Sequence, residues 1–260
     1  MTTLGFWLFV NNVAEALCAE HAGFSGVIVD WEIPDEARRQ VNLEIHHSNL
    51  DLVLGEVSAA INCPVMCRVN KYSDKTAAEV ARALSQGANN ILLPMVRKFE
   101  HALDFKNIIS DKAKWGLMIE TPEALEIAQQ LAELEPDFVY VGLFDLMYTR
   151  ERGHLFEPLI NGEVTALRRQ FHHAQFGVAG LTVIDRGEPI PSLELLKELS
   201  YNRCDFAFFR RSFKRDICKR NMREEVSLLN EAWQLFSKRA DLTKSEDHKK
   251  FISLINEKTK

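Results

Sequence analysis

The sequence lacks the features that mark secreted and membrane-spanning proteins. Its amino terminus carries an apolar stretch, Gly5–Val10, but neither a basic leader nor a signal cleavage site. That stretch is too short to span a bilayer, so we interpret it as a first strand. The five cysteines are an odd number without a Cys-x-x-Cys pair, which favours reduced thiols packed as small apolar groups. These absences predict a cytoplasmic protein.

Two further absences narrow the classes of function. The formal net charge of −5 gives no global attraction for nucleic acid or for an acidic membrane surface, so we expect neither as a partner. A glycine-rich phosphate loop is missing after the first strand, where Asn11-Asn12 stands instead. No internal repeat or interdomain linker is evident, and 260 residues with 46% hydrophobic content can bury one large core.

Short apolar runs alternate along the whole chain with longer segments of helical period. The predicted strands are Phe6–Val10, Gly26–Asp30, Pro64–Asn70, Asn90–Pro94, Trp115–Glu120, Phe138–Gly142, Phe176–Leu181 and Asp205–Phe209. The predicted helices are Val13–Glu20, Leu50–Ile61, Ala77–Gln86, Glu100–Ile109, Pro122–Leu134, Gly162–Ala174, Leu193–Leu199 and Arg223–Ser237.

Strand–helix pairs that fill a domain-sized chain predict an α/β fold of the (β/α)₈ TIM-barrel class. A doubly wound open sheet is the structural alternative. We expect residues 1–240 to form a single catalytic barrel domain. Residues 241–260 are rich in charge and are expected to form a tail or an extra carboxyl-terminal helix.

Two of the apolar runs lead into a single carboxylate, Glu120 and Asp145. A carboxylate at the end of a buried strand is costly to leave unpaired, and TIM barrels place their chemistry at that end of the strands. Mg²⁺ prefers carboxylate oxygens and often uses only one or two of them beside water and substrate. We therefore predict Glu120 and Asp145 as ligands of one Mg²⁺ or Mn²⁺ ion. Helix-capping or surface acids remain the alternative, because a helix is expected from Pro122.

Arg68, Asp30 and Glu32 are predicted at the same edge of the barrel. The guanidinium of Arg68 offers a rigid fork of donors that suits a carboxylate or an enolate oxygen; a structural ion pair is the alternative. Asp30 and Glu32 share one side of their strand. Two acids this close repel one another, which makes one of them a candidate proton carrier. A role in hydrogen bonding to Arg68 or to metal-bound water is the alternative, and we favour it for Asp30.

A basic run follows the eighth predicted strand and begins with Arg210 and Arg211. TIM barrels often bind phosphate in the loops after strands seven and eight, so a phosphorylated or coenzyme-A-bearing substrate would contact these residues. A solvated helix face that pairs with neighbouring acids is the alternative. Two histidine pairs are more typical of surface positions than of catalysis: His46-His47 and His172-His173.

Five short motifs occur in a fixed order between about Gly5 and Asp216. They are Gly23-Phe24…Val29-Asp30-Trp31-Glu32, Cys67-Arg68-Val69-Asn70, Gly87-Ala88…Leu93-Pro94-Met95-Val96, Met118-Ile119-Glu120-Thr121 and Val141-Gly142-Leu143-Phe144-Asp145-Leu146. In this order they resemble the HpcH/HpaI aldolase and citrate lyase β-subunit family.

The resemblance implies a (β/α)₈ barrel that binds Mg²⁺ or a similar ion. It implies formation or cleavage of a carbon–carbon bond beside a ketoacid or thioester carbonyl. Glu120 and Asp145 would be the metal ligands, and Arg68 would bind the substrate oxygen and steady an enolate. The backbone of Gly142-Leu143-Phe144 would contact the ketoacid carboxylate. A metal ion and an arginine both lower the energy of an enolate.

The sequence departs from the family pattern at three places. Ile33 stands where the pyruvate-type aldolases carry a histidine, directly after the glutamate that matches Glu32. The chain passes quickly from Ile109 to Trp115, where the aldolase branch has a long loop. Both departures favour the citrate-lyase-like branch. The third is the turn Gly142-Leu143-Phe144-Asp145, which stands where the aldolases have a Gly-Pro-Ala-Asp-like turn. We expect the bulky ring of Phe144 to narrow the pocket.

We therefore expect a divalent-metal-dependent carbon–carbon lyase or aldolase that acts on a ketoacid or an acyl thioester through an enolate. Glu32 or a metal-bound water would move the proton. One alternative is a barrel enzyme of the phosphoenolpyruvate/pyruvate type, with Arg210 and Arg211 holding a phosphate. The other is a non-catalytic binding barrel that has lost its proton carrier. The apolar face of the helix at Val226–Phe236 favours a homo-oligomer.

Overall fold

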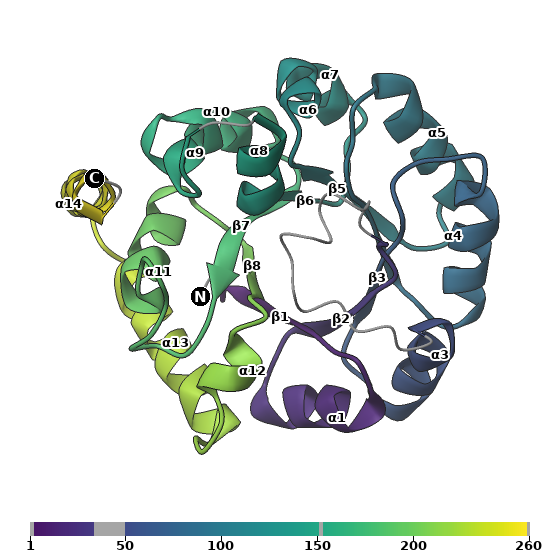
Figure 1. Ribbon diagram of the computed structural model, residues 1–260, viewed down its shortest axis with the longest axis horizontal. Coiled ribbons are helices and arrows are strands. Elements are labelled where there is room, and N and C mark those ends of the chain that lie inside the picture. Colours follow the sequence, from purple (N-terminus) through teal and green to yellow (C-terminus); the bar gives the residue numbers. More distant parts are fainter. Residues whose placement is uncertain (1–2, 34–49, 151–152, 259–260) are drawn as a thin grey trace.

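The strands form a closed parallel barrel (Figure 1). The computed structural model describes residues 3–33, 50–150 and 153–258, so His46-His47 lies outside the described residues. The strands are β1 (Gly5–Phe9), β2 (Gly26–Asp30), β3 (Val65–Arg68), β4 (Asn90–Leu93), β5 (Lys114–Ile119), β6 (Phe138–Val141), β7 (Gln175–Leu181) and β8 (Phe206–Phe209). They follow chain order around the barrel, and β8 pairs with β1 to close it. The predicted (β/α)₈ class is confirmed.

Helices surround the barrel and connect successive strands, as the alternating pattern predicts (Figure 1). The helices at predicted positions are α1 (Val13–Ala22), α3 (Leu50–Ala60), α4 (Thr76–Ser85), α5 (Phe99–Ile109), α6 (Pro122–Glu126), α7 (Ala128–Glu133), α10 (Glu163–Gln170), α11 (Ser192–Tyr201) and α13 (Met222–Ser237). Three short helices are not evident in the sequence pattern: α8 (Leu143–Arg150), α9 (Glu157–Ile160) and α12 (Phe213–Asp216). Each buries too few apolar residues to show a helical period; α8, for example, buries Leu143 and Leu146.

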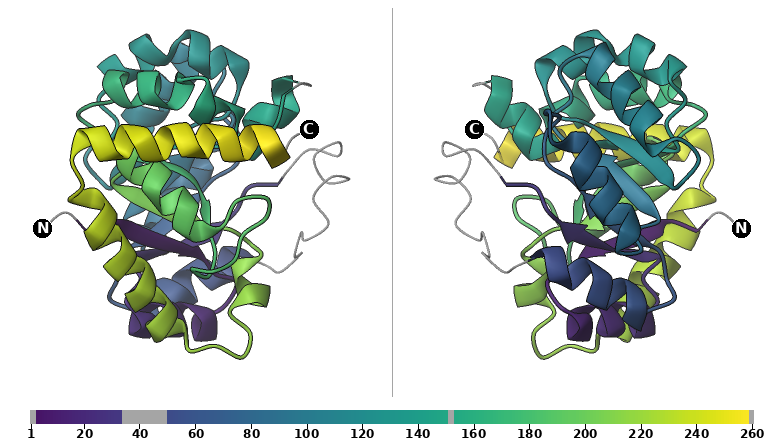
Figure 2. Two further views of the ribbon diagram at one scale, coloured as in Figure 1. Left: turned by 90° about the vertical axis from the view of Figure 1, so that its left-hand side faces the viewer. Right: turned by 90° about the vertical axis from the view of Figure 1, so that its right-hand side faces the viewer.

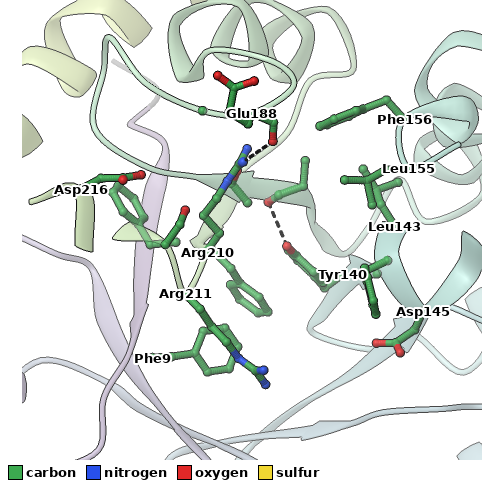
Figure 3. A pocket seen from close by; sticks show the side chains of 18 of the residues that line it. Phe9, Tyr140, Leu143, Asp145, Leu155, Phe156, Glu188, Arg210, Arg211 and Asp216 are labelled. Atoms are coloured by element: carbon green, nitrogen blue, oxygen red, sulfur yellow. Dashed lines mark hydrogen bonds between the residues drawn. The ribbon is translucent and has the colours of Figure 1, made fainter. Parts of the chain in front are cut away.

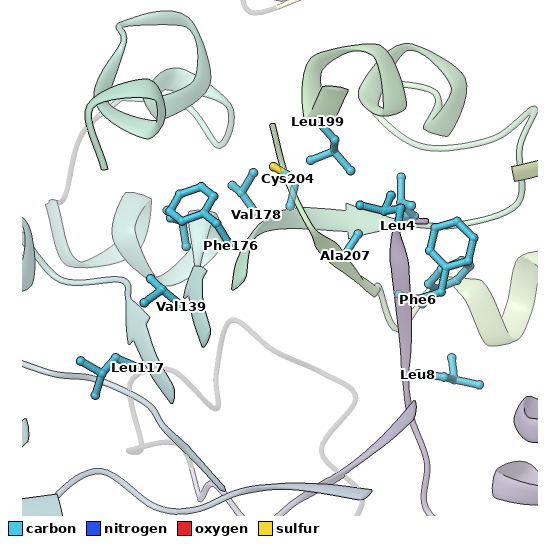
Figure 4. Packing of buried hydrophobic residues seen from close by; sticks show 14 of the residues in the cluster. Leu4, Phe6, Leu8, Leu117, Val139, Phe176, Val178, Leu199, Cys204 and Ala207 are labelled. Carbon is cyan, nitrogen blue, oxygen red and sulfur yellow. The ribbon is translucent and has the colours of Figure 1, made fainter. Parts of the chain in front are cut away.

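Strand alternation divides the core into two layers. The side chains buried inside the barrel are Ile28, Met66, Leu92, Met118, Phe138, Tyr140, Phe206 and Phe208. Side chains on the other face of the strands, such as Val139 and Phe176, belong to a larger core with the surrounding helices (Figure 4). Because Met66 faces inward, Arg68 two residues later does so too, at the carboxyl end of β3.

The apolar face of α13 is buried within its own chain. Val226 and Phe236, at the ends of the predicted face, are 2% and 7% exposed. Helix α13 packs against α1 and α11, and this packing covers the face. The face therefore does not support self-association, and the homo-oligomer stays a prediction.

The carboxyl-terminal helix α14 (Asp241–Lys258) lies across the outside of α11 (Figure 2). Its Phe251 and Ile255 are buried against the rest of the chain. His248 Nδ1 lies 2.9 Å from Oε2 of Glu198, a carboxylate that α11 buries. At the end of α14, Lys258 Nζ donates to the backbone oxygen of Pro189 at 2.6 Å.

None of the helices in the described ranges is long and apolar enough to cross a membrane.

The burial of α14 predicts a clear difference between two aliphatic side chains on this helix. Ile255 is 0% exposed and Leu242 is 74% exposed. We expect Ile255→Ala to lower the free energy of unfolding by about 2–4 kcal/mol. The matched control, Leu242→Ala, should change it by less than about 0.5 kcal/mol. Urea unfolding followed by circular dichroism measures both; equal effects would show that α14 does not dock as described.

Candidate active site

A cavity of about 930 Å³ opens at the carboxyl ends of the strands. Its walls include residues of β1 and β3, of the segments after β2, β5 and β6, of the loops after β7 and β8, and of the last turn of the carboxyl-terminal helix. The predicted site residues that line it are Glu32, Arg68, Glu120, Gly142, Leu143, Phe144, Asp145, Arg210 and Arg211. Asp30 is the remaining predicted residue and does not line the cavity, because it lies behind Arg68 and contacts its guanidinium.

Arg68 is held by two carboxylates. Its Nε and NH2 donate to Oδ1 and Oδ2 of Asp30 at 2.9 and 2.6 Å, which is a bidentate pair. Its NH1 lies 3.1 Å from Oε2 of Glu32, whose side chain is 3% exposed. Burial alone lowers the pKa of the Arg68 guanidinium, but Asp30 and Glu32 outweigh this and raise the pKa well above its ordinary value. Arg68 is thus a fixed, fully charged donor at the cavity wall.

Asn70 anchors the chain just after Glu32. Its Oδ1 accepts from the backbone N–H of Ile33 at 2.8 Å, and its Nδ2 donates to Oε1 of Glu79 at 2.5 Å. The side chain of Ile33 is 65% exposed. Ile33 itself is not among the residues that line the cavity. Asn70 therefore fixes the direction of the segment that carries Glu32.

Glu120 is a fully buried carboxylate with one satisfied oxygen. It is 0% exposed, and its Oε1 accepts from the backbone N–H of Met95 at 2.8 Å. Its Oε2 has no hydrogen-bond partner among the described residues. Burial, then the charges of Asp145 and Glu32, raise the pKa of Glu120 well above its ordinary value, although Arg68 opposes them. A cation at Oε2 would reverse this effect by supplying the missing charge.

Gly142 makes room for that carboxylate. A Cβ atom built on Gly142 would lie 2.4 Å from Oε2 of Glu120, well inside van der Waals contact. Any side chain at position 142 would therefore displace the Glu120 carboxylate. The sequence signal for this role is the single glycine directly after β6.

The backbone after Gly142 turns at once into α8, which was not expected from the sequence. The first amide groups of a helix have no partner within the helix, and in the described part of the chain no acceptor is seen for the N–H groups of Leu143 and Phe144, which both line the cavity. Asp145 lies in the first turn of α8, where a negative charge is favourable. The carboxylate of Asp145 and these amides therefore border the cavity close to Glu120.

The donor set fits a hard divalent ion. No group of three or more His, Cys, Asp or Glu side chains that could hold a metal occurs in the described ranges. Glu120 and Asp145 form a pair of carboxylates that interact electrostatically. Mg²⁺ is often bound through one or two carboxylates and completes its shell with water and substrate oxygens. An ion that demands an all-protein cage does not fit these residues.

Two stacked aromatic rings, Tyr140 and Phe208, form an aromatic floor of the cavity that is not evident from the sequence. The ring of Tyr140 stacks on Phe208 with centroids 3.9 Å apart. The Tyr140 hydroxyl donates to the backbone oxygen of Ala179 at 2.8 Å. Ala179 has a left-handed backbone (φ 61°) next to an irregularity in the β7–β8 pairing. The one available signal was a tyrosine inside the otherwise apolar Phe138–Val141 strand.

Arg210 and Arg211 both line the cavity, but their side chains point in opposite directions (Figure 3). Arg210 donates through Nε to the oxygen of Gly180 and through NH1 to the backbone oxygen of Glu188, both at 3.0 Å. The basic run continues to Arg220, whose NH1 pairs with Glu225 at 2.8 Å. At this position the run forms a structural ion pair, which is the alternative to an anion site.

His172 and His173 precede β7 and lie away from the cavity, at the amino-terminal end of that strand.

Comparisons with known proteins give similarity in fold alone. No family model matches the sequence, and no curated protein matches it either. Among solved structures, citrate synthase SbnG is similar with a TM-score of 0.61 and 15% identity, over 81% of this chain and 87% of that one. RipC from Yersinia pestis is similar with a TM-score of 0.56 and 12% identity, over 87% of this chain and 94% of that one. At these identities the likeness supports the barrel architecture of this chain.

Proposed function

We propose that this protein is a divalent-metal-dependent carbon–carbon lyase or aldolase that acts on a ketoacid or acyl thioester through an enolate. The observation that carries the proposal is the buried Glu120, whose Oε2 has no partner among the described residues and which lies beside Asp145. A cation is the simplest group that stabilises two neighbouring carboxylates. Arg68 on the same cavity supplies a second positive charge, and an enolate needs both.

Each part of the site has a role in this chemistry. Mg²⁺ or Mn²⁺ held by Glu120 and Asp145 would act as a Lewis acid toward the substrate carbonyl. Arg68 would donate to the oxygen that becomes negative as the enolate forms. The free amides of Leu143 and Phe144 at the start of α8 would bind the carboxylate of a ketoacid.

Glu32 is the proposed proton carrier. Its carboxylate lines the cavity beside Arg68, at 3.1 Å from NH1. Ile33 carries no titratable group, so it cannot take the role that a histidine at this position has in pyruvate-type aldolases. The similarity in fold to a citrate synthase is compatible with chemistry at an enolate carbon. A binding barrel without catalysis is the competing proposal, and the tests below distinguish the two.

The first test concerns metal binding. We expect the wild-type protein to bind Mg²⁺ or Mn²⁺, and Glu120→Gln to lose this binding, because the substitution removes the charge but keeps the shape of the side chain. Isothermal titration calorimetry and Mn²⁺ electron paramagnetic resonance measure the binding, and circular dichroism checks the fold. Glu198→Gln, a buried glutamate outside the cavity, is the matched control and should retain the metal. Absence of metal binding by the wild type would refute the proposal.

The second test uses the space at Gly142. We expect Gly142→Ala to weaken Mn²⁺ binding at least about tenfold, because the added Cβ would lie 2.4 Å from Oε2 of Glu120 and must displace the carboxylate. Gly55→Ala is the control, since its Cβ would have its nearest neighbour at 3.8 Å, an ordinary contact. Equal Mn²⁺ affinity in both variants would mean that the geometry of Glu120 does not determine metal binding.

The third test measures enolate formation. With Mg²⁺ or Mn²⁺ present, we expect the protein to exchange the C3 hydrogens of pyruvate with deuterated solvent or to release pyruvate from oxaloacetate. Arg68→Lys keeps the charge but loses the bidentate fork, so it should slow the reaction by about 10²-fold or more. Arg97→Lys, at an exposed ion pair outside the cavity, is the control and should react at the wild-type rate. A wild type that binds metal but is inactive toward all ketoacids and acyl thioesters would favour the binding barrel.

A further inference from the structure

The cavity contains a second, half-buried arginine, Arg210, and its environment is unlike that of Arg68. Among the residues that the structure describes, Arg210 donates to two backbone oxygens, those of Gly180 and Glu188, both at 3.0 Å. Among the described residues, no carboxylate lies within ion-pair distance of its guanidinium. Burial lowers the pKa of Arg210 below its ordinary value although the charges of Asp216 and Glu188 oppose this, whereas Arg68, with two carboxylate partners in direct contact, has a raised pKa. A half-buried cation that no carboxylate contacts directly is stabilised when an anionic ligand binds to it.

The carboxylates near Arg210 are directed elsewhere. Asp216 is 3.1 Å from Nε of Arg215, which donates to it. Asp185 makes a two-point pair with Arg220, at 2.8 and 3.0 Å. The side chain of Glu188 is exposed and points away from Arg210 on the other side of its loop (Figure 3). The positive charge of Arg210 therefore stays available to the cavity.

Two more cations line the same part of the cavity. Arg186, in the loop after β7, has a side chain that is 55% exposed, and its NH1 lies 4.0 Å from Asp216. Lys258, at the end of α14, uses one donor on the backbone oxygen of Pro189. We call Arg186, Arg210 and Lys258 the cationic lobe. These three residues come from three different elements, and all of them border one cavity.

We propose that the cationic lobe binds a second anionic group of the ligand, a phosphate or a carboxylate, at the opposite end of the cavity from Glu120. Guanidinium and ammonium groups are the usual partners of both anions. The loops after the seventh and eighth strands are also a frequent phosphate site in TIM barrels. That this ligand is the substrate of the enolate reaction rests on the function proposed above; the anion site itself does not.

The dimensions of the cavity support a ligand with two anionic ends. A volume of about 930 Å³ is near the upper limit for cavities that hold drug-sized molecules, so a small ketoacid would fill only part of it. In Figure 3, Tyr140 lies between Arg210 and Asp145. The middle section of the ligand, between its two anionic ends, would therefore pack on the rings of Tyr140 and Phe208 and would be uncharged.

The experiment separates the anion site from the metal site. Binding of inorganic phosphate and of succinate to the full chain is measured by isothermal titration calorimetry, in EDTA so that no divalent ion takes part. We expect at least one of the two probes to bind, and Arg210→Met to weaken it about tenfold or more. Because EDTA removes divalent ions, this result does not depend on the metal proposal.

Two further variants secure the interpretation. Arg97→Met removes an exposed arginine that does not line the cavity and should leave anion affinity unchanged. Arg186→Met changes an exposed member of the lobe, so it should fold normally and still weaken binding; it replaces Arg210→Met if that variant is unstable. Binding of phosphate alone indicates a phosphorylated ligand, and binding of succinate alone indicates a second carboxylate. Binding of neither probe, or unchanged affinity in the lobe variants, would overturn the proposal.

Discussion

The arrangement of the cavity depends on one buried carboxylate. Glu120 is fully enclosed at the end of β5, and one of its oxygens has no donor among the described residues. An ionised group in that position is stable only if its surroundings supply positive charge. The backbone N–H of Met95 donates to Oε1 of Glu120, and the absence of a side chain at Gly142 leaves space beside Oε2. The cavity is thus organised around a buried carboxylate whose Oε2 receives no hydrogen bond from the described residues.

Much of the fold follows from the sequence because its signals are local and repeated. Each apolar run is short, each helical segment has a clear period, and a parallel barrel is a simple way to bury every run on both faces. The positions of Glu120, Arg68 and Asp145 at one edge follow from the same rule, since all parallel strands end there. Strand alternation likewise predicts that Asp30 and Arg68 share the interior, where the structure pairs them.

Other features depend on contacts between distant segments and leave no local pattern. Helix α8 is too short to show periodicity, and only Leu143 and Leu146 of its described residues are buried against the rest of the chain. The sequence also shows that α13 has an apolar face, but not that this face covers its own barrel. The sequence identifies Tyr140 as a strand residue, but it does not show that the Tyr140 hydroxyl donates to the backbone oxygen of Ala179. In each case the deciding partner lies far away in the chain.

The bond between Lys258 and Pro189 joins the last turn of α14 to the loop that borders the cationic lobe. Terminal turns of helices open with the smallest free energies in a folded protein. Transient fraying of α14 would therefore release this loop without disturbing the barrel strands. Access to that end of the cavity would then respond to helix opening on the outer surface, while the end that holds Glu120 would keep the rigidity of the β-barrel.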